Sequence, residues 1–428
     1  MGHSGKGIGG LVREDDMRVL LSAYGFSPYR GSECAVGWNI ARELAKWHDV
    51  TVITGDVKDS GYETEYQRYV QEKGAVQGLT VVYLRPTRFI AFIDRLHELP
   101  GLWGLYYLAY NLWQRMAFRK AKELHRERPF DIAHHLNMIG YREPGYMWRL
   151  GIPFFWGPVG GAPNEPLAFH RMFSWSGCFK VALRSLLNEL QKRICWRAKK
   201  AAKSAKKIWA VTDADYRMIH DVWGVKCEKM VETGTVLREE GRVRKWDGKS
   251  PLKIVWSGIH TSRKALPVLL HALSKLDSKA WRCDILGEGP ETGAWQALAG
   301  RLGVASHLHW HSRLPHDQAL QVMNEGHVFA FPSLKEGTPH VVLEALSLGL
   351  PVICHDACGM GTVVTEKCGI KVPLKNPDTS ISGFASAIGT MIDDPSLVAV
   401  KSAAALKRAK ELLWSEKAKV FSDAYCAV

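Results

Sequence analysis

Short apolar segments alternate with longer helical patterns along most of this 428-residue chain, and this alternation limits the folds that it can adopt. The apolar segments are rich in β-branched and aromatic residues, which is typical of strands in parallel sheets joined by crossover helices. The expected strands are Arg18–Ala23, Val50–Thr54, Leu79–Leu84, Asp131–Leu136, Pro153–Trp156, Lys207–Val211, Lys253–Ser257, Arg282–Leu286, His307–His311, His327–Phe331 and Pro351–His355. Two successive sets of strands predict an α/β chain with two Rossmann-like, doubly wound parallel-sheet domains.

A charged stretch with two glycines and a proline separates the two sets of strands and predicts a linker over residues 236–251. We therefore expect an N-terminal domain over residues 17–235 and a C-terminal domain over residues 252–414. Residues 1–16 are polar and glycine-rich, and they are expected to be a disordered leader or a tag. Residues 415–428 have an amphipathic helical pattern and can pack on either domain, including a return to the N-terminal one.

The charge of the chain is concentrated in one region. The chain has 57 Lys and Arg against 43 Asp and Glu, for a net charge of +14. Residues 101–207 alone hold 19 Lys and Arg against 6 Asp and Glu. A basic region of this kind favours a partner with an acidic surface. The apolar fraction of 46% excludes disorder as a description of the whole chain.

The cysteine pattern and the absence of long apolar runs predict a cytoplasmic protein that does not span a membrane. The nine cysteines are scattered and form no CxxC pair, which fits reduced thiols better than a disulfide framework or a zinc site. The N-terminus lacks the pattern of a signal peptide, and no uninterrupted apolar run reaches 18 residues.

Ligands of open parallel sheets bind outside the carboxyl ends of the strands, so the segment after the expected strand His327–Phe331 is the first candidate site. This segment contains, in order, Glu336, Gly337, Thr338, Pro339, His340 and Glu344. Thr338 and Pro339 suit the start of a helix, whose free amide groups would hold a diphosphate. The two carboxylates can accept hydrogen bonds from sugar or ribose hydroxyls. The spacing alone also fits a first-turn charge and a solvated helix residue.

Three other strand ends of the C-terminal set carry candidate donor-binding residues. They are Gly258, Arg263 and Lys264 after the first strand of the set, Gly287 after the second, and Arg313 and Leu314 after the third. The adjacent cations Arg263 and Lys264 can neutralise a diphosphate leaving group without a metal, although such a pair in a loop is also often solvated. Gly287 lets the backbone approach a ligand closely, and the third loop offers backbone groups to a base.

The order of these elements resembles retaining glycosyltransferase family 4, also described as glycosyl transferases group 1. The resemblance runs from Met17 to the C-terminus, and the segments that carry it are MRVLLSAYGFSPYRGSECAVGWNIARELA, DIAHHLNMIGYREPGYMWRLGIPFFWGPVGG, VETGTV, SRKALPVLLHAL, ILGEGPE and EGTPHVVLEALSLGLPVI. It implies a GT-B fold, in which two domains face a central cleft, and transfer of a sugar from a nucleotide-sugar donor with retention of configuration.

The resemblance also implies roles for residues on the donor side. Glu336 would contact the donor sugar, Glu344 the ribose, and Arg263 and Lys264 the diphosphate. Many members carry Gly-Phe-Gly where this chain has Gly-Thr-Pro at residues 337–339. Proline has no N–H, so the amide donors would come from Thr338, His340 or their neighbours.

The acceptor side is expected in the N-terminal domain. Gly31, Ser32 and Glu33 resemble the family's glycine-rich loop, which faces the donor phosphates; a plain strand-to-helix turn is the alternative. His134 and His135 lie where family members often place a histidine near the reacting carbon, but a histidine at a strand end is also often structural. The expected catalytic residues are Glu336, His134, His135, Arg263 and Lys264, and the expected acceptor-side residues are Glu33, Asn137, Tyr141, Arg142, Gly160 and Gly161.

Residues 86–128 and 176–207 mix basic and aromatic side chains, and such helices can lie on an anionic membrane surface. A soluble helical layer with a charged face is the alternative, and nucleic acid is disfavoured because no recognisable nucleic-acid module accompanies the charge. The Asp-Ala-Asp sequence at residues 213–215 has the form of a metal-binding D-x-D motif. Thr212 or Asp213 fits a helix N-cap better, so no essential metal is expected.

The sequence thus predicts a metal-independent retaining hexosyltransferase without a cofactor. Its donor would be a UDP- or GDP-sugar and its acceptor a glycan or a lipid-linked glycan, at the cytoplasmic face of a membrane. One alternative is a GT-B-like sugar-nucleotide epimerase or phosphorylase, and another is a non-catalytic subunit that binds glycan or membrane. The sequence makes no prediction of the oligomeric state.

Overall fold

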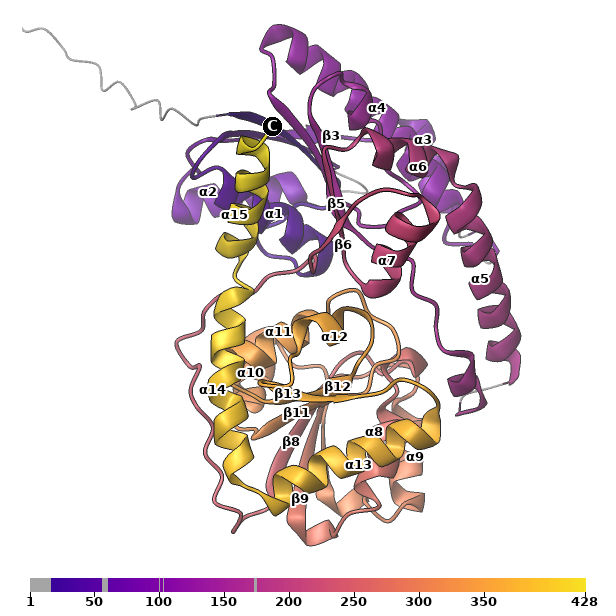
Figure 1. Cartoon of the computed structure of the whole chain (residues 1–428), viewed down its shortest axis with the longest axis vertical. Coiled ribbons are helices and arrows are strands. Elements are labelled where there is room, and N and C mark those ends of the chain that lie inside the picture. The colour runs from indigo at the N-terminus through magenta and orange to yellow at the C-terminus, as the bar shows by residue number, and fades with distance from the viewer. Residues whose placement is uncertain (1–16, 56–60, 100, 103, 173–174) are drawn as a thin grey trace, which may run out of the picture.

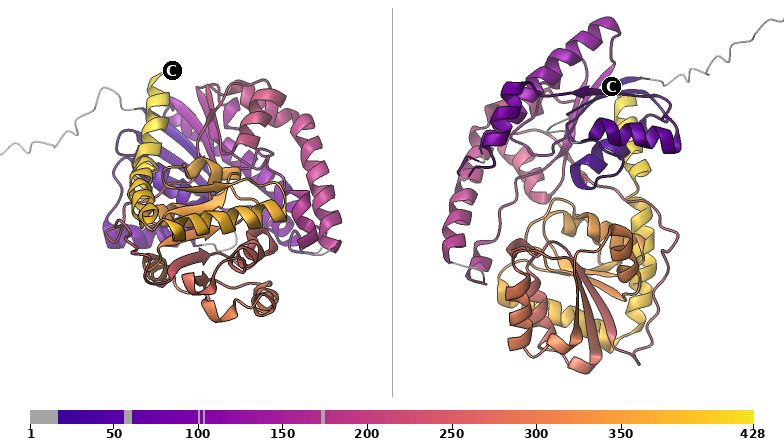
Figure 2. Two further views of the ribbon diagram at one scale, coloured as in Figure 1. Left: turned by 60° about the horizontal axis from the view of Figure 1, so that its bottom comes forward. Right: turned by 180° about the vertical axis from the view of Figure 1, so that it is seen from behind.

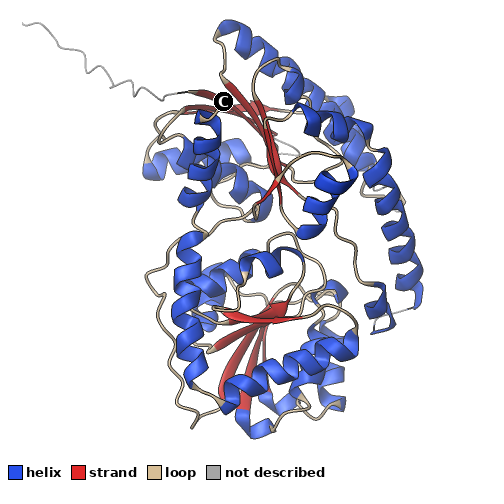
Figure 3. Ribbon diagram, in the orientation of Figure 1, coloured by secondary structure: helices blue, strands red, loops and turns tan. Residues whose placement is uncertain are grey.

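The computed structural model describes residues 17–55, 61–99, 101–102, 104–172 and 175–428, without the side chains of residues 170–180 and 278. The predicted leader over residues 1–16 lies outside the described residues. The chain forms two α/β domains that follow one another along the long axis of the molecule (Figure 1). In each domain helices lie on both sides of a parallel sheet (Figure 3), which confirms the predicted doubly wound architecture.

The N-terminal domain is built on a seven-stranded parallel sheet of order β3-β2-β1-β4-β5-β6-β7. The strands are β1 (Arg18–Ala23), β2 (Asp49–Gly55), β3 (Leu79–Leu84), β4 (Ile132–Asn137), β5 (Phe154–Val159), β6 (Lys207–Ala210) and β7 (Glu228–Lys229). The six strands expected from apolar segments are present within two or three residues at each end. The edge strand β7 has two charged, exposed residues, so the hydrophobic pattern contains no signal for it.

The helices of this domain cover both faces of the sheet. They are α1 (Ser32–Leu44), α2 (Tyr62–Lys73), α3 (Arg88–Leu96), α4 (Leu105–Glu127), α5 (Trp175–Ile194), α6 (Trp196–Ser204) and α7 (Asp213–Arg217), with 3-10 helices η1 (Met147–Arg149) and η2 (Leu167–Met172) and a π-helical turn η3 (Met218–Val222). Side chains alternate along β1, so Val19 and Leu21 pack with α1, whereas Leu20 packs with α4 and α6.

The C-terminal domain is built on a six-stranded parallel sheet of order β10-β9-β8-β11-β12-β13. The strands are β8 (Leu252–Ser257), β9 (Trp281–Leu286), β10 (Leu308–His311), β11 (Val328–Phe331), β12 (Val352–His355) and β13 (Gly369–Val372). The helices are α8 (Leu266–Leu273), α9 (Thr292–Arg301), α10 (His316–Asn324), α11 (His340–Ser347), α12 (Cys358–Val363), α13 (Pro377–Asp393) and α14 (Ser396–Glu411), with 3-10 helices η4 (Ser262–Lys264), η5 (Ser278–Ala280) and η6 (Ala305–His307). The sequence analysis did not predict β13, which is half-buried and short.

The chain passes between the domains twice, and the two passages are hydrogen-bonded to each other. Thr235 N donates to Leu412 O at 3.0 Å, and Trp414 N donates to Thr235 O at 3.3 Å. A Cβ atom at Gly234 would lie 2.6 Å from the Trp414 ring, so a glycine lets the two passages touch. The last helix, α15 (Trp414–Cys426), then packs on α1 in the N-terminal domain, as the views in Figures 1 and 2 show.

The predicted linker, residues 236–251, packs along the C-terminal domain. The side chain of Arg244 is buried, and its guanidinium donates to Leu348 O and to Asn324 Oδ1, each at 2.6 Å. Burial lowers the pKa of Arg244 to about 10. The backbone N–H of Arg244 donates to Ser402 Oγ at 2.7 Å, so the linker is fixed to α14 as well.

Gly349 lies directly against the backbone of the linker. Its φ is +79°, and a Cβ atom there would lie 2.2 Å from Arg242 O in the linker. Gly303 has a φ of +70° and also follows a helix, but nothing lies within 4 Å of its Cβ position. Gly303→Ala is expected to lower the free energy of unfolding by about 1–2 kcal/mol, the cost of a left-handed alanine.

Gly349→Ala is expected to cost about 1–3 kcal/mol more than Gly303→Ala, because the new methyl group must displace the linker backbone. Urea unfolding of the two variants, followed by circular dichroism, measures the difference. Equal unfolding midpoints would show that the linker does not hold this position.

Candidate active site

Arg263 and Lys264 follow β8 at its carboxyl end, and both point to the carboxylate of Glu336, which follows β11. Lys264 Nζ lies 2.7 Å from Glu336 Oε1, and Arg263 Nη1 lies 3.4 Å from Glu336 Oε2. Ser333 Oγ donates to Glu336 Oε1 at 2.6 Å. Burial lowers the pKa of Lys264, although the charge and hydrogen bond of Glu336 oppose this shift. The structure thus brings together three of the predicted residues, with one cation more than the carboxylate neutralises.

Glu344 lies on α11 and has different partners from Glu336. His316 Nε2 donates to Glu344 Oε1 at 2.8 Å, and Arg238 Nη2 lies 4.0 Å from the same oxygen. Burial alone would raise the pKa of Glu344, but the hydrogen bond from His316 and the charges of His316 and Arg238 outweigh it, and the pKa is lowered. The same hydrogen bond raises the pKa of His316. Glu344 is therefore a carboxylate held in place by two basic side chains.

The turn before α11 is bonded to the segment that enters the linker. Thr338 N donates to Glu232 Oε1 at 2.6 Å, and Thr338 Oγ1 donates to Glu232 Oε2. A Cβ atom at Gly337 would lie 2.3 Å from Glu232 Oε1, so the carboxylate sits directly over this glycine. The His340 ring is hydrogen-bonded to Thr233 Oγ1, at 2.9 Å from Nε2, and burial lowers the pKa of His340. The Thr338 amide is therefore bonded to Glu232 in this structure, and its expected role toward a diphosphate stays a prediction.

The glycines after β8 and β9 bring two loops into direct backbone contact. A Cβ atom at Gly287, where φ is +109°, would lie 2.2 Å from Gly258 O. Gly258 N donates to Leu286 O at 3.1 Å. After β10, Arg313 is exposed and Leu314 packs against the apolar cluster under α10 and α11. Leu314 lies two residues before His316, so this loop adjoins the partner of Glu344.

Glu33 lies at the start of α1, among the predicted acceptor-side residues. The Asn137 side-chain amide donates to Glu33 O at 2.8 Å and to Gly25 O at 3.0 Å, which fixes the loop to β4. Ile139 N donates to Glu33 Oε1 at 3.4 Å, while Glu33 Oε2 is buried with no partner among the described residues. Burial, and to a smaller degree the charge of Glu232, raises the pKa of Glu33 to about 7.

The other residues of this predicted loop have more open surroundings. No atom lies within 4 Å of the Cβ position of Gly31, and Ser32 has a positive φ of 55°. The loop therefore presents little side-chain bulk next to Glu33, as a ligand-facing turn requires.

The two predicted histidines are both buried, on opposite faces of β4. His134 Nε2 donates to Gly157 O at 2.8 Å, and His134 Nδ1 accepts from the hydroxyl of Tyr425. Burial lowers the pKa of His134 to about 3, and no part of the side chain is exposed. Both ring nitrogens are thus used within the fold, and the expected catalytic role of His134 is wrong. His135 packs beside Gly145, and burial lowers its pKa to about 4, so its role stays a prediction.

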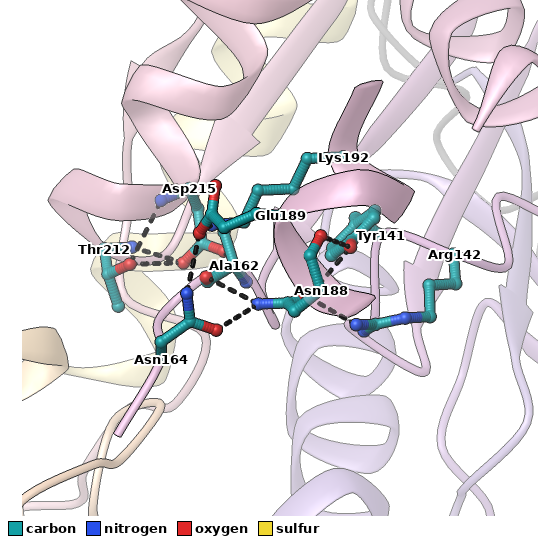
Figure 4. Close-up of polar contacts among 9 residues, drawn as sticks. All are labelled: Tyr141, Arg142, Ala162, Asn164, Asn188, Glu189, Lys192, Thr212 and Asp215. Atoms are coloured by element: carbon teal, nitrogen blue, oxygen red, sulfur yellow. Dashed lines mark hydrogen bonds and ion pairs between the residues drawn. The ribbon is translucent and has the colours of Figure 1, made fainter. Parts of the chain in front are cut away.

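Tyr141 and Arg142 are tied to α5 (Figure 4). Tyr141 Oη donates to Asn188 Oδ1 at 2.9 Å, and Arg142 Nε donates to Gln191 Oε1 at 2.6 Å. Tyr141 is fully buried, so it does not line a cleft as we expected. Arg142 is partly exposed and lies with its guanidinium 4.5 Å from the centroid of the Tyr141 ring.

The predicted glycines next to this cluster are backbone contacts. Gly160 N donates to Ile139 O at 2.7 Å, and Tyr141 N donates to Gly160 O at 3.0 Å. Gly161 has a φ of +97° and adjoins Tyr141 and Arg142. The two glycines therefore hold the loops after β4 and β5 together.

Asp215 on α7 extends the same polar network (Figure 4). Its carboxylate accepts from Ala162 N at 2.8 Å and from Thr212 N at 3.0 Å, and burial raises the pKa of Asp215 to about 6. Thr212 caps α7 through its side chain, which confirms the N-cap interpretation of the Asp-Ala-Asp sequence. Next to this network a surface hollow is lined by Asn164, Glu189, Lys192, Arg217 and Asp221, among others.

Several of these residues carried no usable sequence signal. Glu232, Arg238, His316 and Asn188 each bond a residue distant in the sequence, so their pairing depends on the tertiary fold. Ser333 bonds Glu336, three residues further along the same loop. Only Glu232 lay in a segment that the resemblance singled out. Ser333 could have been found from the sequence, because it is a polar residue that closely follows an expected strand.

Residues 251–394 match the protein-family model described as glycosyl transferases group 1. The resemblance inferred from the sequence is thereby confirmed for the C-terminal domain. D-inositol 3-phosphate glycosyltransferase of Streptomyces griseus is 29% identical over 31% of this chain and 27% of its own length. Alpha-D-kanosaminyltransferase of Streptomyces kanamyceticus is 24% identical over 34% of this chain and 37% of its own length. The chain thus matches only about a third of the length of these two curated relatives.

Longer matches cover both domains. MMP alpha-(1->4)-mannosyltransferase of Mycolicibacterium hassiacum is 22% identical over 89% of this chain and 90% of its own length. The lipopolysaccharide outer core galactosyltransferase WaaB superimposes with a TM-score of 0.63 over 95% of this chain and 99% of that one, at 14% identity. Anabaena HepE in complex with UDP gives a TM-score of 0.60 over 96% and 100%, at 13% identity. The fold is GT-B, as predicted.

The raised pKa of Glu33 makes the free energy of unfolding depend on pH. Its pKa of about 7 lies above the ordinary value of 4.5, so between these pH values the folded chain binds more protons than the unfolded chain. The contribution of protonated Glu33 to the free energy of unfolding is therefore fully present below pH 4.5, and it is lost as the pH rises to about 7. Glu33→Gln cannot titrate, so its free energy of unfolding does not fall in this way. The difference in free energy of unfolding between Glu33→Gln and wild type is therefore expected to change in favour of the variant by about 2–3 kcal/mol from pH 5 to pH 8.

Glu123→Gln, on the exposed side of α4, is the matched control and should show no such change. Urea unfolding at several pH values measures both differences. Parallel pH profiles for wild type and Glu33→Gln would mean that Glu33 titrates as an ordinary surface carboxyl.

Proposed function

We propose that this chain is a glycosyltransferase that moves a hexose-type sugar from a nucleotide-sugar to a glycan or a lipid-linked glycan, with retention of configuration. The observation that carries the proposal is the convergence of Arg263 and Lys264 on Glu336 at the carboxyl edge of the C-terminal sheet. This edge lies within the part of the chain that matches glycosyl transferases group 1. HepE, whose fold is similar, has been crystallised with UDP and glucose.

The donor would lie along this edge with its diphosphate against Arg263 and Lys264. Charge grows on the departing phosphate as its bond to the anomeric carbon breaks, and two fixed cations stabilise that charge without a metal ion. Glu336, oriented by Lys264 and Ser333, accepts hydrogen bonds from sugar hydroxyls. Glu344, held by His316, accepts from the ribose hydroxyls.

The acceptor hydroxyl would attack the oxocarbenium-like sugar from the face that the phosphate leaves. A bond forms between the acceptor oxygen and the anomeric carbon, and the acceptor proton passes to the leaving phosphate oxygen. Glu336 is paired with two cations, and it therefore holds the sugar and does not act as one of the two flanking carboxylates of a glycosidase. Glu33, with a carboxylate oxygen that has no hydrogen-bond partner among the described residues, orients the acceptor hydroxyl in this proposal.

Arg263→Ala is expected to lower kcat by about 10², the usual loss when one preorganised charge-stabilising group is removed. The assay incubates the protein with UDP- and GDP-hexoses and a lipid-linked acceptor in the presence of EDTA, and it quantifies released nucleoside diphosphate by chromatography. Arg301→Ala, an exposed cation at the end of α9, is the control and should keep wild-type turnover. Unchanged turnover in Arg263→Ala, or loss of activity on chelation, would overturn the metal-free phosphate role.

The same assay separates the proposal from its alternatives. A transferase releases the nucleoside diphosphate and extends the acceptor, whereas an epimerase returns an altered sugar nucleotide. A phosphorylase requires inorganic phosphate, and a non-catalytic subunit releases no nucleotide at all. The paired cations around Glu336 favour the transferase over the non-catalytic subunit, because binding alone does not require charge stabilisation at a leaving group.

The same protein is proposed to act at the cytoplasmic face of a membrane, on which it lies peripherally. Exposed apolar side chains recur at helical spacing on α5, and exposed basic side chains follow on α5 and α6. The apolar set is Leu183, Leu186, Leu187, Leu190 and Ile194, and the basic set is Arg184, Arg193, Lys200 and Lys203, with Lys199 half-buried beside them. No helix among the described residues is both long enough and apolar enough to cross a bilayer. In Figures 1 and 2, α5 lies along the outer edge of the molecule.

Two aromatic residues within the predicted basic and aromatic region, residues 86–128, are buried and do not contribute to its surface. Tyr110 and Trp113 are buried against Tyr24, with ring centroids 4.8 and 4.7 Å from that of Tyr24. Phe89 and Phe92 on α3 are exposed and remain available for a membrane contact.

Vesicle sedimentation tests the membrane proposal. The chain is expected to bind vesicles rich in anionic phosphatidylglycerol, to bind phosphatidylcholine vesicles less, and to dissociate as salt is raised. The double variant Leu186→Ser, Leu190→Ser should lose most of this binding, because both side chains are exposed on α5. Val400→Ser removes an equally exposed apolar side chain on α14 and serves as the control. Equal binding by both variants would refute a role for α5.

A further inference from the structure

Three histidines alternate at the edge of the C-terminal sheet, at residues 307, 309 and 311. β10 is the edge strand, and it pairs in parallel with β9 so that His309 lies opposite Asp284. Residues two apart on a strand share a face, and so do residues in register on neighbouring strands. His309, His311 and Asp284 therefore lie on one face, at one edge. The third histidine, His307, is hydrogen-bonded to Arg282 instead and takes no part.

The ligand atoms of these three side chains already lie close together. His311 Nε2 lies 2.8 Å from Asp284 Oδ1, and His309 Nδ1 lies 3.4 Å from the same oxygen. All three candidate ligand atoms fall within 4.8 Å of one another. A tetrahedral ion with bonds of about 2.0–2.1 Å separates its ligand atoms by about 3.3 Å. Rotations of the side chains alone can bring the three ligand atoms from their present separations to this distance.

The exposure of the group suits an ion that enters from solvent. His309 is 73% exposed, whereas His311 and Asp284 are 15% and 25% exposed. One ligand is therefore free to turn, and the other two are held by the sheet. Two imidazoles and a carboxylate favour zinc and its neighbours over magnesium or calcium, which prefer oxygen ligands alone.

We propose that Asp284, His309 and His311 form a surface site for a divalent transition-metal ion of the zinc class, which fastens the edge strand β10 to β9. Three protein ligands leave a fourth position for water. The site uses none of the residues proposed for transfer, because Asp284 lies on β9 and the two histidines on β10, whereas Arg263 and Lys264 follow β8 and Glu336 follows β11. β10 leads directly into Arg313 and Leu314, so a bound ion would steady the strand that precedes the expected base-binding loop.

Calorimetric titration of the full chain with zinc chloride tests the site, after treatment with a chelator and exchange into a non-coordinating buffer at pH 7.5. One ion is expected to bind per chain. His309→Ala and Asp284→Asn should each weaken binding by at least about tenfold. His309 is mostly exposed, so its replacement is expected to leave the fold intact, and circular dichroism checks this. Bound cobalt should give the intense visible absorption of a four-coordinate site in wild type and lose it in His309→Ala.

His220→Ala is the matched control, because His220 and Asp221 form an exposed pair, 2.8 Å apart, to which the described part of the chain adds no third ligand. Its zinc affinity should equal that of wild type. The proposal is overturned if wild type shows no saturable binding up to about 1 mM zinc. It is equally overturned if His309→Ala and Asp284→Asn bind zinc as tightly as the control. Neither result bears on nucleotide-sugar transfer, which is assayed in EDTA.

Discussion

Hydrogen bonds from Thr338 to the carboxylate of Glu232 join the two domains at the turn before α11. Glu232 lies where the chain leaves the N-terminal domain, just before the linker. Its carboxylate accepts hydrogen bonds from both the amide and the hydroxyl of Thr338. The carboxylate also occupies the amide end of the turn before α11, where an anionic ligand would otherwise be favoured. A diphosphate therefore competes with the protein's own carboxylate there, and Arg263 and Lys264 become the main source of positive charge for it.

The distribution of charge around the carboxylates accounts for the two halves of the proposed donor site. Glu336 faces two cations that follow a neighbouring strand, so the local excess is positive and suits a diphosphate. Glu344 is held by His316 and Arg238, from α10 and the linker, so the linker also shapes the site. Glu33, on the other domain, is half-buried and has a raised pKa, and one of its carboxylate oxygens is buried without a partner among the described residues.

Local patterns in the sequence were sufficient for the architecture and for part of the site. Alternation of strands and helices predicted both sheets, because buried parallel strands must be apolar. Of the strands in the described ranges, it missed the short edge strands β7 and β13. Strand-end positions predicted that Arg263, Lys264 and Glu336 belong to one donor site, since the carboxyl ends of parallel strands share one edge. His134 failed because its burial depends on α15, which arrives from the far end of the chain. Glu232 and His316 were missed because the tertiary fold brings their partners to them: Thr338 lies in the other domain, and Glu344 lies on the neighbouring helix α11.

We propose above all that the C-terminal domain binds a nucleoside diphosphate through Arg263 and Glu344. Calorimetric titration with UDP, GDP and ADP, without added metal, tests it most directly when wild type is compared with the double variant Arg263→Ala, Glu344→Ala. The account predicts saturable binding of one of these nucleotides to wild type and to the Arg301→Ala control, and its loss in the double variant. Absence of binding by all three nucleotides, or equal affinity in the double variant, would contradict it.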